Sequence, residues 1–234
     1  MRTPSDRLIV ALDGSSADEA IRLARQLRPV IQTVKIGSAL FTRFGPQVIR
    51  QVRRLGLHVM LDLKFFDIPS TVELSVRAAT THDVSMLTVH ASGGEHMLQA
   101  AVAASRSEAD RLHLPAPVVI GVTVLTSVAG TSRAAVRRRV ATLADTAARA
   151  GCGAVVASAQ EAGLIRRRLA QRVEIFCPGI RLAGAGRADQ ARVLGPREAL
   201  MAGADRLIVG RPITGAADPL RAAQQILNEM EIDE

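Results

Sequence analysis

The chain has 234 residues, of which 48% are hydrophobic and 22% are charged, and its formal net charge is +8. This composition can bury the core of one large domain and excludes an intrinsically disordered protein. No apolar run reaches the ~18 to 20 residues that cross a bilayer, and the polar start is unlike a secretory signal. Cys152 and Cys177 are too few for a disulfide scaffold. We therefore expect a soluble cytoplasmic protein.

Short apolar, β-branched runs alternate along the chain with longer stretches of helical periodicity. The runs that predict strands are Arg7–Leu12, Thr33–Gly37, His58–Asp62, Ser85–His90, Val118–Val124, Ala154–Ser158, Glu174–Cys177 and Arg206–Gly210. The stretches that predict helices are Ala17–Leu27, Pro46–Leu55, Ser70–Thr81, Glu95–Ser105, Arg133–Ala150, Gln160–Ala170, Ala188–Ala202 and Pro219–Glu229. Such alternation calls for parallel strands, because each helix carries the chain back across the sheet.

Eight strand–helix units in a chain of this length predict a single-domain (β/α)₈ barrel over residues 1–234. No change of composition and no Pro- or Ser-rich linker divides the chain. The alternative is a doubly wound open sheet, which usually has a glycine-rich turn after its first strand. Here that turn is Asp13–Ser16, with one glycine, and the string Gly184–Gly186 lacks a third glycine and follows no strand directly. The barrel is therefore favoured.

Polar residues stand where the predicted strands end, the edge at which such barrels carry their chemistry. In chain order they are Asp13, Lys35, Asp62 with Lys64 and Asp67, His90, Thr126 with Ser127, Arg181, and Gly210 with Arg211. One polar residue at a strand end is ordinary, but this many on one rim indicates a site. We expect His90 to form a hydrogen bond inside the barrel.

Lysine is rare in this sequence, since Lys35 and Lys64 are the only two among thirty Lys and Arg residues. Both stand at predicted strand ends, and an ammonium, unlike a guanidinium, can give up its proton. Asp62 and Lys64 are two residues apart, so in an extended strand their side chains project to the same side. A carboxylate this close stabilises the charged ammonium by roughly 1 to 4 kcal/mol.

The last two strands are followed by residues suited to an anion. Gly179 and Gly210 let backbone N–H groups approach a phosphate, and Arg181 and Arg211 offer planar donor groups. A phosphate site at this position recurs in (β/α)₈ barrels. The stretch 181–190 is rich in Gly and Ala and is a candidate lid.

Several strings closely resemble the orotidine 5′-phosphate decarboxylase family, in its compact bacterial form. They are Asp62–Pro69 (DLKFFDIP), Val89–Gly94 (VHASGG), Leu125–Ser127 (LTS), Pro178–Arg181 (PGIR) and Val209–Arg211 (VGR). The resemblance runs from the first predicted strand to the last. It implies a homodimeric barrel with shared sites that converts orotidine 5′-monophosphate (OMP) to UMP in de novo pyrimidine biosynthesis, with no cofactor and no metal.

The resemblance also implies a role for individual residues. Lys64 would protonate C6 of the pyrimidine, within a charged array completed by Asp62 and by Asp67, which would reach into the partner subunit's site. Asp13 and Lys35 would hold the ribose, with Thr71 joining from across the interface. The other implied substrate-binding residues are Ile68, with no more specific role, Thr126 and Ser127 at the base, Gln190 between base and phosphate, and Arg181, Gly210 and Arg211 at the phosphate.

Simple chemistry agrees with these roles. Loss of CO₂ from C6 leaves an electron pair in an sp² orbital that the ring cannot delocalise, and the sequence has no cofactor motif to accept it. The site must stabilise that charge electrostatically and then supply a proton. An ammonium can do both, whereas a guanidinium is a poor acid.

Two alternatives remain open from the sequence. One is a Mg²⁺-dependent sugar-phosphate decarboxylase or aldolase of the same barrel superfamily, although Lys35 stands where those enzymes place a metal-binding Glu. The other is a nucleic-acid binder, suggested by the +8 charge and by Arg137–Arg139. That cluster falls on the outer face of a predicted helix, no nucleic-acid motif accompanies it, and aromatic residues are scarce, so we expect neither nucleic acid nor membrane as a partner.

Overall fold

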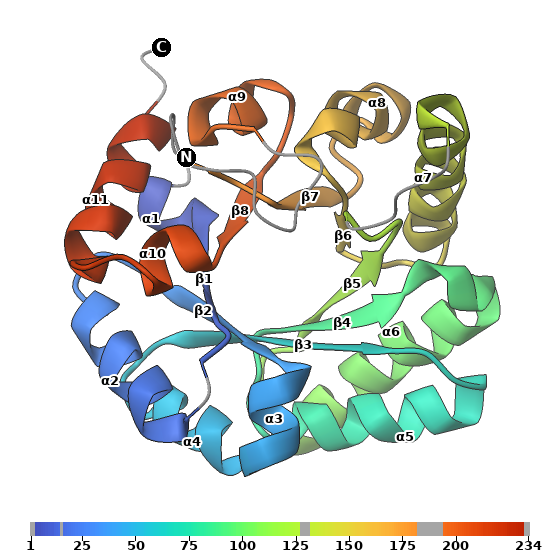
Figure 1. The fold of residues 1–234 in the computed structure, drawn as a ribbon. Helices are drawn as coiled ribbons and strands as arrows, with labels where there is room; N and C mark the ends of the chain where they lie inside the picture. Colours follow the sequence, from blue (N-terminus) through green and yellow to red (C-terminus); the bar gives the residue numbers. More distant parts are fainter. Residues whose placement is uncertain (1–2, 15, 127–131, 182–193, 232–234) are drawn as a thin grey trace.

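A closed barrel of eight parallel strands forms the centre of the molecule, and helices surround it (Figure 1). The structure is a computed structural model and describes residues 3–14, 16–126, 132–181 and 194–231. Each strand pairs with its neighbours in chain order, and β1 closes the barrel against β8. The predicted (β/α)₈ barrel is confirmed. Within the described ranges, no helix is long and apolar enough to cross a membrane.

The strands and helices follow one another in nearly strict alternation. The strands are β1 (Leu8–Leu12), β2 (Thr33–Gly37), β3 (His58–Phe65), β4 (Met86–His90), β5 (Val118–Val122), β6 (Ala154–Val156), β7 (Glu174–Pro178) and β8 (Arg206–Val209). The helices are α1 (Pro4–Arg7), α2 (Ala17–Leu27), α3 (Ser38–Phe44), α4 (Gln47–Arg53), α5 (Pro69–Thr80), the 3₁₀ turn η1 (Ala91–Gly93), α6 (Gly94–Leu112), α7 (Arg133–Arg149), α8 (Ala159–Leu169), α9 (Pro196–Met201), α10 (Arg211–Thr214) and α11 (Pro219–Met230).

The strands are buried on both faces, which explains why they are nearly continuous apolar runs. Alternate residues point into the barrel and pack there as a separate cluster of Ile9, Ala11, Met60, Met86, Ile120, Ala154, Phe176 and Ile208. The remaining strand residues point outward and form the main core with the helices. Burying each of the larger side chains contributes about 1.5 to 3 kcal/mol. The inner cluster therefore fills the interior of the barrel between its two ends.

The predicted elements differ from the observed ones mainly at their ends. β3 continues past Asp62 to Phe65, and the short helices α1, α3 and α10 were not predicted. α9 begins at Pro196, directly after its N-cap Gly195, so the predicted start at Ala188 is wrong for Leu194 and Gly195. Residues 188–193 lie outside the described ranges.

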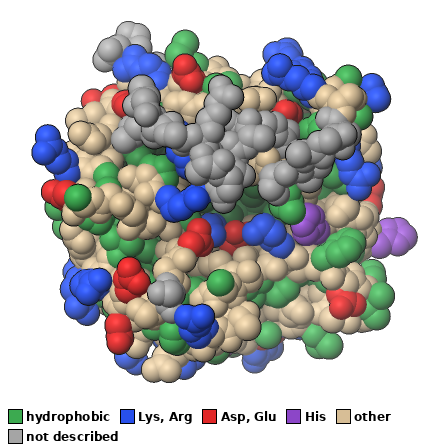
Figure 2. Space-filling model, viewed as in Figure 1, with side chains coloured by type: hydrophobic (Ala, Val, Ile, Leu, Met, Phe, Trp, Pro, Cys, Tyr) green, Lys and Arg blue, Asp and Glu red, His purple; other side chains and the backbone are tan. Residues whose placement is uncertain are grey.

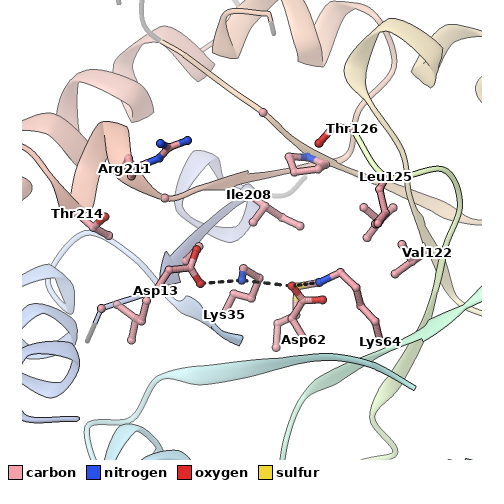
Figure 3. Close-up of a pocket in the computed structure, with 18 of the residues that line it drawn as sticks. Asp13, Lys35, Asp62, Lys64, Val122, Leu125, Thr126, Ile208, Arg211 and Thr214 are labelled. Atoms are coloured by element: carbon pink, nitrogen blue, oxygen red, sulfur yellow. Dashed lines mark hydrogen bonds and ion pairs between the residues drawn. The ribbon is translucent and has the colours of Figure 1, made fainter. Parts of the chain in front are cut away.

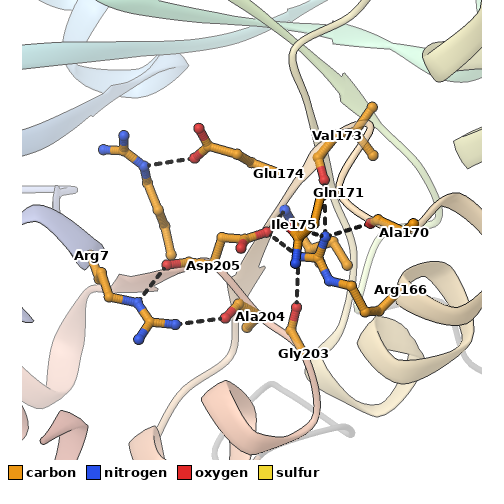
Figure 4. Close-up of polar contacts among 11 residues, drawn as sticks. Arg7, Arg166, Ala170, Gln171, Val173, Glu174, Ile175, Gly203, Ala204 and Asp205 are labelled. Atoms are coloured by element: carbon orange, nitrogen blue, oxygen red, sulfur yellow. Dashed lines mark hydrogen bonds and ion pairs between the residues drawn. The ribbon is translucent and has the colours of Figure 1, made fainter. Parts of the chain in front are cut away.

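A polar network ties together the amino-terminal ends of β7 and β8 (Figure 4). Asp205 accepts hydrogen bonds from the Ile175 N–H at 2.7 Å and from the Arg166 guanidinium. Arg7 donates to the carbonyls of Asp205 and Ala204, which fastens the amino-terminal segment beneath the barrel. The network lies at the barrel end opposite the carboxyl ends of the strands, so it serves stability rather than chemistry.

Candidate active site

A cavity of about 490 Å³ opens at the carboxyl end of the barrel. Acidic and basic side chains gather in the hollow of this face (Figure 2). Of the predicted site residues, the cavity is lined by Asp13, Lys35, Asp62, Lys64, Thr126, Arg181, Gly210 and Arg211. These residues come from both halves of the chain, so the barrel gathers them on one rim as the sequence predicted.

Four charged side chains form an unbroken row along one wall of the cavity (Figure 3). Lys35 Nζ donates to Asp13 Oδ1 at 3.1 Å and lies 3.2 Å from Asp62 Oδ2. Lys64 Nζ donates to the same Asp62 oxygen at 2.8 Å. Asp62 Oδ2 is therefore shared by two ammonium groups. The sequence predicted the Asp62–Lys64 pair but not the contact between Lys35 and Asp62.

Burial and charge compete in this row, and charge prevails. Burial alone would raise the pKa of Asp62, but the charges of Lys35 and Lys64, with hydrogen bonds from Lys64 and Thr88, hold that pKa below its usual value. Burial alone would lower the pKa of Lys35, but the carboxylates of Asp62 and Asp13 raise it above its usual value. Both groups are consequently charged near neutral pH.

Strand alternation explains how three members of the row meet. Ala11 and Met60 belong to the inner cluster, so Asp13 and Asp62, two residues further on, face the same interior. Lys35 pairs in register with Ala11 and Met60 and points inward between them. The glycine at position 37 leaves space for the Asp13 and Lys35 side chains, because a Cβ there would lie 3.1 Å from Asp13 Oδ1 and 3.3 Å from Lys35 Nζ.

Lys64 reaches the row by a different route. The pairing of β3 with β4 shifts between Leu61 and Phe65, and Lys64 has a φ of +51°. A left-handed conformation is uncommon for a residue with a side chain and costs about 1 to 3 kcal/mol. The bulge turns the Lys64 side chain back over Asp62, so the contact does not arise from simple alternation.

The opposite wall of the cavity is apolar. It is formed by Val122, Val124, Leu125, Val156 and Ile208, from β5, β6, β8 and the segment after β5. The Lys64 side chain runs past this wall, and its ammonium points to Asp62 (Figure 3). A flat ring lying against this wall would place one edge against the charged row and exclude water from it.

The ends of β7 and β8 supply a third region, rich in anion-binding groups. Pro178, Gly179 and Arg181 line the cavity next to Gly210 and Arg211. Gly179 has a φ of +81°, a conformation that favours glycine. Arg211 lies on the far side of the cavity from Lys64 (Figure 3), and Arg181 lines the same cavity, so an anion and a ring could occupy the cavity together.

Three predicted residues do not line this cavity. Asp67, Ile68 and Thr71 lie on the exposed segment that leads from β3 into α5, and the Asp67 carboxylate accepts a hydrogen bond from the Ile68 N–H at 2.7 Å. Two further predicted residues, Ser127 and Gln190, lie outside the described residues, as does most of the candidate lid.

The chain matches the model of the "Orotidine 5′-phosphate decarboxylase / HUMPS family" over residues 6–226. Relatives named orotidine 5′-phosphate decarboxylase match nearly the whole chain. The one from Moorella thermoacetica is 46% identical over 97% of this chain and 93% of its own. The one from Saccharophagus degradans is 42% identical over 98% of this chain and 97% of its own. The chain belongs to the orotidine 5′-phosphate decarboxylase family.

A solved structure agrees with this family assignment. The orotidine 5′-phosphate decarboxylase of Lactobacillus acidophilus superposes with a TM-score of 0.84 and 30% sequence identity, covering 97% of this chain and all of the other. The resemblance read from the sequence motifs is therefore confirmed, and with it the prediction that the chain is a carboxy-lyase.

Two features of this candidate site were missed or misread in the sequence. Thr88, on β4, is fully buried and hydrogen-bonded to both Asp62 and Lys64. Its only signal is a polar residue at an inward position between Met86 and His90. The prediction of an internal hydrogen bond for His90 is wrong for Nδ1. This atom is buried and has no hydrogen-bond partner among the described residues. The ring packs edge-on against Phe66 instead.

Proposed function

We propose that the chain, acting as one catalytic domain over residues 1–234, converts OMP to UMP and CO₂ without cofactor or metal. The observation that carries this proposal is the Asp62–Lys64 pair facing an apolar wall inside a barrel of this family. The pair offers a fixed ammonium where negative charge would develop, and the wall keeps water from competing with it.

In the proposed reaction the bond between C6 and the carboxylate carbon breaks, and its electron pair stays on C6. Lys64 Nζ stabilises that charge and then transfers a proton to C6, while CO₂ leaves. Asp62, which accepts from Lys64 at 2.8 Å, holds the ammonium in direction. The neutral amine regains its proton from solvent, which reaches the Lys64 side chain because 37% of it is exposed.

The rest of the substrate fits the remaining regions of the cavity. We assign the ribose hydroxyls to Asp13 and Lys35, whose charged groups already form a donor–acceptor pair at 3.1 Å. We assign the base to Thr126 and the apolar wall. The phosphate is assigned to Arg181, Gly210 and Arg211. Ser127, at the base, and Gln190, between base and phosphate, stay predictions of the sequence.

We further propose a homodimer in which each subunit completes the other's site. Three large apolar side chains are exposed on the segment around Asp67, namely Phe66, Ile68 and Leu74 at 61%, 64% and 68%. Adjacent exposed hydrophobic side chains of this kind are typical of an interface. Asp67, Ile68 and Thr71 lie on the same segment, so burying it against a second copy would bring them to the partner's cavity.

Complementation tests the shared site. Lys64→Ala and Asp67→Ala subunits are expected to be inactive as homodimers, since each lacks one member of every array. A heterodimer of the two keeps one site with both residues intact, so we expect about half of the wild-type kcat per dimer. Tandem affinity purification with two different tags isolates the heterodimer, and an inactive heterodimer contradicts sharing.

Arg211→Ala tests the phosphate assignment. We expect KM for OMP to rise about 10- to 100-fold, the effect of losing a hydrogen bond to a charged group. For orotidine, which lacks the phosphate, Arg211→Ala and the wild type should have the same turnover. Arg138→Ala, an exposed arginine on α7, is the matched control and should leave both substrates unaffected. Equal losses on OMP and orotidine would contradict the assignment.

The proposed activity is tested directly by following the absorbance of OMP with EDTA present. We expect full turnover in chelator. Activity on a sugar phosphate that requires added Mg²⁺ would instead favour the metal-dependent relatives. A place in pyrimidine biosynthesis and in the cytoplasm stays a prediction.

A further inference from the structure

Thr88 occupies an unusual position behind the charged row. Its side chain is fully buried at the centre of β4. The hydroxyl donates to Asp62 Oδ1 at 3.0 Å and accepts from the backbone N–H of Lys64 at 2.9 Å. One hydroxyl group thus contacts the carboxylate and the backbone of the lysine that form the central pair of the site.

The β3 bulge explains why a hydroxyl is needed there. Leu61 pairs with Leu87 and Phe65 pairs with Val89, so the three residues from Asp62 to Lys64 lie opposite Thr88 alone. The Thr88 hydroxyl accepts a hydrogen bond from the Lys64 N–H. A backbone donor inside the protein is costly to leave unpaired. The hydroxyl thereby supports the left-handed conformation of Lys64, whose φ is +51°.

The direction of the hydroxyl hydrogen follows from these contacts. A hydroxyl has one hydrogen to donate and two lone pairs to accept. Because an N–H of Lys64 occupies a lone pair, the hydrogen is free for Asp62. Oδ1 is then held by Thr88, and Oδ2 faces both Lys64 and Lys35, at 2.8 and 3.2 Å. Rotation of the carboxylate would break the Thr88 bond.

We propose that Thr88 is a positioning residue, whose hydroxyl aims Asp62 and the Lys64 backbone so that the ammonium is held at the reacting carbon. This inference rests on the proposed function, since it assigns Thr88 to the same charged array. Thr88 lies behind the row and does not line the cavity, so its effect falls on the chemical step rather than on substrate binding.

Two substitutions at this position separate the hydroxyl from the methyl group. Thr88→Val keeps the shape and removes the hydroxyl, and we expect kcat to fall about 10- to 100-fold, as for a lost hydrogen bond to a charged group. The Kd for UMP should stay within about threefold, because the phosphate and ribose contacts are untouched. Thr88→Ser keeps the hydroxyl and is expected to retain kcat within about threefold.

The matched control is Thr80→Val. Thr80 is equally buried, and its hydroxyl donates to a backbone carbonyl, that of Val76, inside α5. This variant loses a buried hydrogen bond away from the cavity, so it should lower thermal stability without changing kcat. Should Thr88→Val fail to fold, Thr88→Ala and Thr88→Ser give the same comparison, since only the serine keeps a hydroxyl.

The pH dependence of kcat provides a further test, because a purely structural role of Thr88 would not change it. The Thr88 hydrogen bond favours the charged form of Asp62, so the acid limb of kcat should shift to higher pH in Thr88→Val and not in Thr80→Val. A wild-type kcat in Thr88→Val, or an equal loss in Thr88→Ser, overturns the inference. Failure of the wild-type protein to turn over OMP would instead refute the proposed function.

Discussion

Lys64→Ala is expected to lower kcat for OMP by about 10⁴-fold or more, because the variant loses both the positive charge at C6 and the proton donor. The Lys64 side chain is partly exposed and contributes its charged end to the cavity, so the fold should survive. Stopped-flow or long-incubation assays of OMP loss give kcat, and thermal unfolding checks the fold.

Lys64→Arg separates charge from proton transfer. The guanidinium keeps the positive charge but stays protonated at any working pH, so we expect kcat within about tenfold of the alanine variant. UMP binding should survive in both variants, since Arg181 and Arg211 are unchanged. A near-wild-type kcat in either variant would contradict the assignment of Lys64 as donor.

Asp62→Asn is expected to reduce both turnover and stability. The amide cannot balance the two ammonium groups that share Asp62 Oδ2, and removing one partner of a buried ion pair costs about 3 to 5 kcal/mol. Without the carboxylate, the Lys64 ammonium is no longer held in place, and we expect kcat to fall about 10²- to 10³-fold. Urea unfolding at neutral pH and steady-state kinetics measure the two effects.

A second substitution isolates the cause of the instability. In Asp62→Asn the Lys35 ammonium is buried next to Asp13 alone, so adding Lys35→Met removes a charge that lacks one of its two partners. We expect the double variant to regain part of the lost stability and none of the lost turnover. A double variant less stable than Asp62→Asn would show that charge balance is not the reason.

The stability effect also depends on pH in a defined direction. The pKa of Asp62 is lower in the folded chain than its ordinary value of 3.8, because the lysine charges outweigh burial. Its contribution is therefore present above that ordinary value and is lost as pH falls through the folded pKa. The difference in unfolding free energy between wild type and Asp62→Asn should be largest near neutral pH and shrink in acid.

Strand and helix periodicity was enough to predict the barrel, because each apolar run had to be buried on both faces. The same alternation predicted that Asp13, Lys35 and Asp62 would share one rim. The Asp62–Lys64 contact was also predicted, although for an incomplete reason. Two residues of regular strand would point both side chains inward, whereas the structure uses a bulge and a left-handed lysine.

What could not be predicted depends on contacts between strands distant in sequence. Thr88 is an ordinary strand residue until the β3 bulge places the Lys64 N–H against its hydroxyl. Gly37 is important only because the side chains of Asp13 and Lys35 lie close to where a Cβ would be at this position. The 3.2 Å contact from Lys35 to Asp62 requires the register between β2 and β3, which the sequence does not specify.

The shared oxygen of Asp62 has a consequence for the end of each cycle. In the proposed reaction, once Lys64 has given up its proton, the Asp62 carboxylate still has Lys35 as a counterion, 3.2 Å away. The neutral Lys64 amine therefore does not leave the Asp62 carboxylate as an isolated anion that would have to be neutralised before UMP leaves. In the proposed cycle, UMP can therefore leave before solvent returns a proton to Lys64.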